Sequence, residues 1–253
     1  MFSNGYIFRY ASIMVILVAA LLSAAAILLK PAQERNVKIE KIQDILRSAN
    51  IESTTANAEE LYDKHIVKEI TITSEGEEVS VYANGKFEKG NQRAFLIDLK
   101  AELKAQQDFK AGKSTKQPVF PLFACKVGEE EMYIIPMYGM GLWGPVWGNI
   151  ALKNDLSTVV GVTFGHKGET PGLGAEISTP MFVSQFPGKT ILDENGNFVS
   201  IKVVKGGVNN SNINPSHGVD AISGGTITSV GVSNMIKDCL ENYVMYIKKQ
   251  KAI

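Results

Sequence analysis

The chain enters its last predicted helix through Asp220-Ala-Ile-Ser-Gly-Gly-Thr-Ile-Thr-Ser229, which holds four hydroxyl side chains and two adjacent glycines. Glycine lets the backbone turn sharply and approach a ligand closely. Hydroxyl side chains suit helix N-caps, and a helix N-terminus offers free N–H groups and the positive end of a dipole. The stretch therefore predicts either an ordinary capped helix after a glycine turn or a phosphate site at a helix N-terminus.

The pattern that follows predicts an amphipathic helix from about residue 228 to about residue 248. Its apolar stripe recurs in steps of three and four residues: Ile236, Cys239, Leu240, Tyr243, Val244 and Ile247. Such a stripe packs against a sheet, and two hairpin patterns precede it, 149–153 with 159–164 and 191–192 with 198–204. The fold class that we predict is α+β, with antiparallel hairpins and a C-terminal amphipathic helix.

Earlier segments predict further elements of the same domain. Alternating residues indicate strands over 69–73 and 78–82, separated by a turn at Ser74-Glu75-Gly76. Helices are indicated over 58–68 and 181–186.

Residues 10–29 carry no charge, and about 20 helical residues span a hydrocarbon core of about 30 Å. The small residues at 23–26 also fit a cleaved signal peptide. Because the apolar run continues through Leu29, we predict a retained transmembrane helix. An amphipathic juxtamembrane helix should follow and end near Asn50. The positive-inside rule weakens for long following domains, so the residues alone leave the sidedness open.

Composition excludes several classes of function. The 26 basic and 26 acidic residues balance, which argues against nucleic acid as a partner. Cys125 and Cys239 form no C-x-x-C pair, so this chain alone predicts no metal or iron–sulfur site. They are either free thiols, which we favour, or one disulfide. No nucleophile elbow, zinc-protease helix or dinucleotide fingerprint occurs, so we predict no catalytic residues.

A second glycine-rich loop, Glu169-Thr-Pro-Gly-Leu-Gly174, follows a predicted strand. Thr170 and the backbone amides can hydrogen-bond a planar polar ligand, although a tight structural turn is the alternative. In one α+β domain this loop and the 220–229 stretch can reach the same sheet edge. Together they suggest a ligand with a phosphate at one end and a flat ring at the other. Trp143, in the glycine-rich tract 139–148, fits the core, a membrane interface or a stacking surface.

These residues carry a resemblance to covalent FMN-binding domains. Asp220–Thr226 resembles their flavinylation motif D-x-x-S/T-G-A-T, with Gly225 where the family usually has alanine, and Glu169–Gly174 resembles their second flavin-site motif. With one N-terminal span, Gly141-Leu-Trp-Gly144 and this length, the chain resembles the C-subunit (NqrC) family of Na⁺-translocating NADH:quinone oxidoreductases.

The resemblance implies FMN joined through its phosphate to Thr226 by a flavin transferase that uses FAD. It also implies two groups of contacts around that cofactor. The expected phosphate contacts are Ser223, Gly224, Gly225, Thr228 and Ser229. The expected ring contacts are Glu169, Thr170, Leu173 and Gly174, with Leu142 and Trp143 as flavin or partner contacts.

The implied domain plan is an N-terminal cytoplasmic segment at 1–9, the transmembrane helix at 10–29, a juxtamembrane helix with the first part of an extracytoplasmic domain at 30–120, and the FMN-binding domain at 121–253. The implied function is electron relay through FMN within a membrane complex that couples NADH oxidation and quinone reduction to Na⁺ export. The chain is not expected to be active alone.

The resemblance implies a single-pass protein of the bacterial inner membrane, with its main domain on the periplasmic side and other membrane subunits as partners. Two alternatives stay open. One is the G subunit of the related Rnf complex, and the other is a membrane-tethered binding or assembly protein without flavin.

Overall fold

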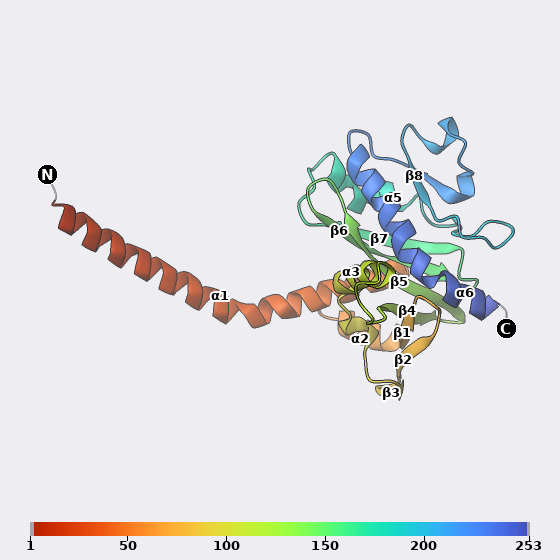
Figure 1. The fold of residues 1–253 in the computed structure, drawn as a ribbon, viewed down its shortest axis with the longest axis horizontal. Helices are drawn as coiled ribbons and strands as arrows, with labels where there is room; N and C mark the ends of the chain where they lie inside the picture. The colour runs from red at the N-terminus through yellow and green to blue at the C-terminus, as the bar shows by residue number, and fades with distance from the viewer. Residues whose placement is uncertain (1–2, 252–253) are drawn as a thin grey trace. The chain divides into compact units, whose positions relative to one another are not determined.

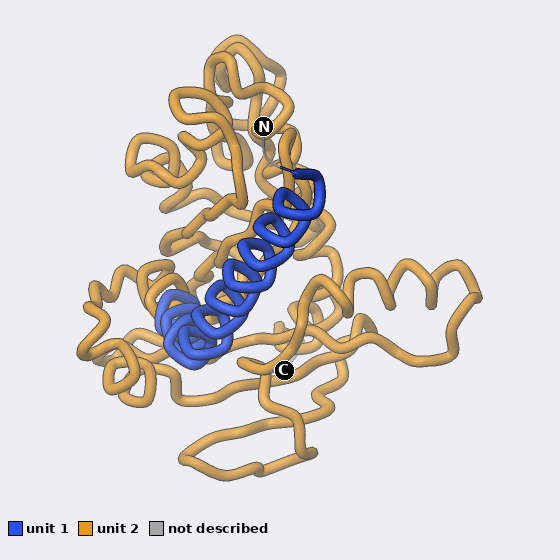
Figure 2. The backbone as a smooth tube through the Cα atoms, turned by 90° about the vertical axis from the view of Figure 1, so that its left-hand side faces the viewer, with its two compact units in different colours: residues 1–42 blue, residues 43–253 orange. Residues whose placement is uncertain are grey.

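A computed structural model describes residues 3–251 and divides the chain into two compact units, residues 1–42 and 43–253 (Figure 2). Residues 1–2 of the predicted N-terminal segment and 252–253 of the predicted C-terminal domain lie outside the described residues. The first unit is helical. Its helix, α1 (Asn4–Ser48), continues for six residues into the second unit.

Helix α1 contains the uncharged run at 10–29, and its most apolar window has a mean hydropathy of 2.8 with no residue buried. By length and composition it can cross a membrane. The predicted transmembrane and juxtamembrane helices form one continuous helix, because Pro31 lies inside α1 without ending it. Proline removes one i→i−4 hydrogen bond, and the ladder resumes after it. The helix ends at Ser48, close to the predicted Asn50, whose φ is 59°.

The second unit is built on a seven-stranded sheet in the order β3-β2-β1-β4-β5-β6-β7, with every neighbouring pair antiparallel (Figure 1). The strands are β1 (Ile66–Thr73), β2 (Glu78–Ala83), β3 (Lys86–Lys89), β4 (Val119–Val127), β5 (Glu130–Met140), β6 (Pro145–Lys153) and β7 (Val159–His166). A separate parallel pair is formed by β8 (Lys202–Val204) and β9 (Gly218–Asp220). The predicted α+β class is confirmed.

The remaining elements are helical. The α-helices are α2 (Ala58–His65), α3 (Leu99–Lys110), α4 (Pro180–Val183), α5 (Thr226–Leu240) and α6 (Val244–Lys251). The 3₁₀ helices are η1 (Ala94–Leu96), η2 (Gly174–Ser178), η3 (Val208–Asn210), η4 (Pro215–His217) and η5 (Glu241–Tyr243).

One of the two predicted hairpins is confirmed, and the other forms only next to its turn. Residues 149–153 and 159–164 pair within β6 and β7. Leu192 and Phe198 form an antiparallel bridge, and the N–H groups of Val199 and Ser200 donate to the Ile191 carbonyl. The rest of the predicted second arm, 202–204, is β8 and pairs with β9 instead. Ser200 has a φ of 62°, a left-handed conformation that ends the second arm of a hairpin. The predicted helix 58–68 stops at His65, because the β-branched residues that follow begin β1.

The final helix starts at Thr226, two residues earlier than predicted, and a 3₁₀ turn at 241–243 divides it into α5 and α6. Its apolar stripe is confirmed. Ile236, Cys239, Leu240, Tyr243 and Ile247 are buried, and Val244 is half-buried. The predicted hydroxyl N-cap is absent from this helix start. Gly225 occupies the N-cap position and has no side chain that could bond the free N–H groups.

Helix α5 lies across β5, and two glycines allow the close approach (Figure 1). A Cβ atom on Gly139 would lie 2.7 Å from the Cβ of Met235. A Cβ atom on Gly231, in the middle of α5, would overlap the carbonyl oxygen of Met140. The start of α5 is thereby fixed beside the turn between β5 and β6.

Gly231→Ala tests this packing. In an exposed helix interior, alanine is more stabilising than glycine by about 1 kcal/mol. Here the added methyl overlaps backbone, so we expect a net loss of about 1–3 kcal/mol in the free energy of unfolding. The measurement is denaturant unfolding of the full chain in detergent. Val230→Ala, at an exposed position one residue away, is the control and should change stability little. A stabilised Gly231→Ala protein would contradict the packing.

Cys125 and Cys239 are free and buried, as predicted. Burial raises the pKa of both thiols to about 12. Both should therefore react slowly with a disulfide reagent in the folded protein at mildly alkaline pH, and rapidly after denaturation. Above pH 9 the unfolded chain releases thiol protons that the folded chain keeps, so these thiols lower stability as pH rises. Rapid labelling of both thiols in the folded protein would contradict their burial.

Candidate functional site

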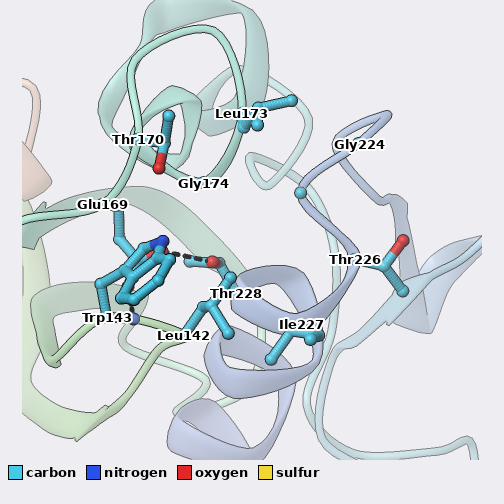
Figure 3. A pocket seen from close by; sticks show the side chains of 11 residues that line it. Leu142, Trp143, Glu169, Thr170, Leu173, Gly174, Gly224, Thr226, Ile227 and Thr228 are labelled. Atoms are coloured by element: carbon cyan, nitrogen blue, oxygen red, sulfur yellow. Dashed lines mark hydrogen bonds between the residues drawn. The ribbon is translucent and has the colours of Figure 1, made fainter.

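The two glycine-rich loops meet at a cavity of about 390 Å³, as the sequence predicted (Figure 3). Its walls come from the β5–β6 turn, the loop after β7 and the first turn of α5. The lining residues are Leu142, Trp143, Glu169, Thr170, Leu173, Gly174, Gly224, Gly225, Thr226, Ile227 and Thr228. Segments more than 80 residues apart in sequence therefore build one site.

The loop after β7 and the approach to α5 interlock through Leu173 and Gly224. Gly224 has a φ of 76°, a conformation that favours glycine. A Cβ atom at Gly224 would lie 2.6 Å from the Cδ2 atom of Leu173, and one at Gly225 would lie 3.2 Å from the Leu173 carbonyl group. The paired glycines thus let the Leu173 loop lie directly against the start of α5.

A buried carboxylate joins the three walls. Glu169 is 5% exposed. Its Oε1 atom accepts a hydrogen bond of 2.8 Å from the backbone N–H of Trp143, and its Oε2 atom accepts one of 2.6 Å from the Thr228 hydroxyl (Figure 3). Within residues 3–251, no ion pair involves Glu169. The carboxylate is held by two donors and by no cation.

Thr226 is the first residue of α5 and is half-buried. Its hydroxyl makes no hydrogen bond within the described residues, and Figure 3 shows it apart from the Thr228–Glu169 bond. The Ser229 N–H donates to the Gly225 carbonyl as the first bond of the helix ladder. The N–H groups of the first three helical residues, 226–228, therefore precede the ladder and lie at the positive end of the helix dipole.

The other hydroxyls of the 220–229 stretch have different surroundings. Thr228 is buried and bonds Glu169. Ser229 is buried, and its hydroxyl accepts a hydrogen bond of 3.2 Å from the backbone N–H of Ile222. Ser223 is exposed. Neither Ser223 nor Ser229 lines the cavity, which leaves Thr226 as the lining hydroxyl at the helix start without a protein partner.

Exposed apolar side chains form the rim of the cavity. Leu142 is 48% exposed, Trp143 68%, Leu173 42% and Ile227 60%. The sequence reasoning missed Ile227. The sequence could have indicated it, because Ile227 is an apolar residue at the start of the predicted helix that lies outside the apolar stripe.

The cavity fits a flat, anionic ligand such as FMN. Its volume lies near the lower end of the usual range for small-molecule sites, about 300–1,000 Å³. Apolar residues can pack on a ring, and the helix start can bind a phosphate. Among the described lining residues there is no lysine, arginine or histidine, so the helix N-terminus is the source of positive potential.

Comparisons with known proteins point to one family. Residues 141–241 match the FMN-binding domain family. The C subunit of the Na⁺-translocating NADH-quinone reductase of Haemophilus ducreyi is 33% identical over 86% of this chain and 82% of its own length. The same subunit of Pseudomonas aeruginosa is 30% identical over 95% of this chain and 97% of its own length.

A solved structure agrees with the sequence relatives. The crystal structure of the C subunit of the Na⁺-translocating NADH-quinone reductase from Parabacteroides distasonis matches with a TM-score of 0.72 and 36% identity. The match covers 87% of this chain and 96% of that one. This chain therefore belongs to the C-subunit family of the Na⁺-translocating NADH-quinone reductases.

Proposed function

We propose that this chain is the flavin-carrying C subunit of a Na⁺-translocating NADH-quinone reductase, and that it relays electrons through an FMN held covalently by Thr226. The observation that carries the proposal is the unpartnered Thr226 hydroxyl at the start of α5, within the cavity built by both flavin motifs. Family membership supports a membrane-anchored flavin carrier within an oxidoreductase complex.

Attachment uses the Thr226 Oγ atom. We propose that a flavin transferase transfers the FMN part of FAD to this atom. An Oγ–phosphorus bond forms, the pyrophosphate bond of FAD breaks, AMP leaves and the hydroxyl proton is released. At Thr226 the N–H groups of the first turn of α5 and the helix dipole would stabilise the negative charge of the resulting phosphodiester.

The other residues that line the cavity can orient the flavin and tune its environment. A bound FMN supplies the capacity to accept and donate electrons, and the protein orients it and tunes its environment. Leu142, Trp143, Leu173 and Ile227 provide the apolar rim that can pack on the ring and exclude water. Thr170 and the backbone at Gly174 provide polar groups for the ring edge. Covalent linkage keeps the cofactor in place despite the open apolar rim.

Partners and a location can also be proposed for this chain. The similar proteins are named as subunits of a quinone reductase, which supports other membrane subunits of that complex as partners and argues against the Rnf G subunit. The interlocked cavity argues against a binding protein whose glycine loops serve only as turns. We propose a bacterial inner-membrane location, with residues 1–9 in the cytoplasm and the domain after the α1 span on the periplasmic side.

Thr226→Ala should abolish flavin attachment, because no Oγ atom remains to form the ester. The full chain is coexpressed with a flavin transferase and denatured, and flavin fluorescence is measured on the protein band. Thr226→Ser keeps the hydroxyl and should retain a signal. Thr115→Ala, in an exposed loop, is the matched control and should load normally. Fluorescence that survives in Thr226→Ala would place the ester elsewhere.

The two glycines of the motif should respond differently to alanine. Gly224→Ala adds both a strained φ and a contact with Leu173, so we expect a loss of about 1–3 kcal/mol in stability and reduced loading. Gly225→Ala requires shifts of a few tenths of an ångström and should load nearly as well as the natural chain. Thermal unfolding and in-gel flavin fluorescence measure both effects. Equal behaviour of the two variants would contradict the described loop contact.

A further inference from the structure

Glu169 is an unusual lining residue for a cavity that is proposed to bind an anion. Its side chain is buried, both of its oxygens accept hydrogen bonds, and no cation pairs with it among residues 3–251. A buried carboxylate without a cationic partner is costly unless hydrogen bonds stabilise the charge. The fold nevertheless keeps space for it. A Cβ atom at Gly141 would lie 2.5 Å from Oε1, and one at Gly174 would overlap Oε2.

The two hydrogen bonds of Glu169 connect parts of the site that are distant in sequence. One holds the backbone of Trp143 in the β5–β6 turn, and the other holds the side chain of Thr228 two residues after Thr226. The exposed indole of Trp143 belongs to a turn with glycines at both ends, Gly141 and Gly144. Without the bond to Glu169, this glycine-flanked turn has one fewer constraint on its backbone.

We propose that Glu169 is a positioning residue with two effects: it fixes the Trp143 turn against α5, and its charge, which no side-chain cation pairs with among residues 3–251, makes a flavin in this cavity harder to reduce. The second effect rests on the proposed function, and the first does not.

The charge effect follows from electrostatics. Reduction adds electrons to a group in the cavity, and any electron that enters without a proton raises the negative charge there. A fixed carboxylate in a partly buried wall disfavours that change more strongly than a solvated one would. No lysine or arginine lines the described cavity to offset it. The midpoint potential should therefore be lower than it would be without this charge.

Glu169→Gln separates charge from geometry. The amide is isosteric with the carboxylate. Its oxygen can accept from the Trp143 N–H, and its NH₂ group can donate to the Thr228 oxygen. The variant thus removes the charge and can keep both contacts, with the direction of the Thr228 hydrogen bond reversed. Glu169→Ala removes the charge and both hydrogen bonds.

The positioning effect is tested without flavin. In the full-length Thr226→Ala chain, hydrogen exchange of the segment 141–147 reports the Trp143 amide. Adding Glu169→Ala should speed exchange by about tenfold or more, because a hydrogen bond to a charged group is lost. Adding Glu169→Gln should restore most of the protection. Unchanged exchange in the alanine variant would overturn the positioning effect.

The charge effect is tested on the flavin-loaded full chain by titration with dithionite. Glu169→Gln should raise the equilibrium constant for reduction by about tenfold, which is about 30 mV for a two-electron couple. Glu241→Gln removes an exposed carboxylate at the far end of α5 and should shift the potential little. An unchanged or lower potential in Glu169→Gln, or failure of that variant to fold or load, would overturn the charge effect. A wild-type chain that takes up no flavin would instead refute the proposed function and leave the exchange result standing.

Discussion

The close approach of α5 to β5 is the constraint on which the rest of the site depends. Gly139 on the strand and Gly231 on the helix leave no room for side chains between the two backbones. Because the buried stripe of α5 packs on the sheet, the first turn of the helix lies at the end of β5. A helix N-terminus, which can stabilise an anion, therefore lies beside the β5–β6 turn and the loop after β7.

The cavity is then completed by contacts that act across the three segments. Leu173 packs against the backbone at Gly224 and Gly225, and Glu169 bonds both Trp143 and Thr228. The first contact depends on the two glycines before α5, and the second depends on the buried carboxylate of Glu169. The result is an apolar, open-rimmed site in which the positive potential comes from a helix end. The covalent attachment proposed for Thr226 would suit such a site, because an open rim and a single anion-binding element bind a free nucleotide weakly.

Much of this arrangement could be predicted from sequence, and the failures have local causes. The uncharged run at 10–29 identified the apolar part of α1, and periodicity identified the β6–β7 hairpin and the buried stripe of the last helix, because those features depend on patterns within one segment. Pattern reasoning failed at 200–204, where Ser200 has a left-handed backbone, and it predicted two helices where α1 continues through Pro31. In the site, the meeting of the two loops was predictable. The roles of Thr228 and Ser229 were not, because their hydroxyls turn inward to partners 59 and 7 residues away.

The proposed attachment site is Thr226, at the start of α5. The most direct test is peptide mass mapping of the protein purified from its own membrane, without any substitution. Cleavage after lysine releases the segment 206–237, which contains the whole motif. We expect this peptide to carry one FMN phosphoester, localised by fragmentation to Thr226. An unmodified peptide, or a flavin on Ser223, Thr228 or Ser229, would contradict it.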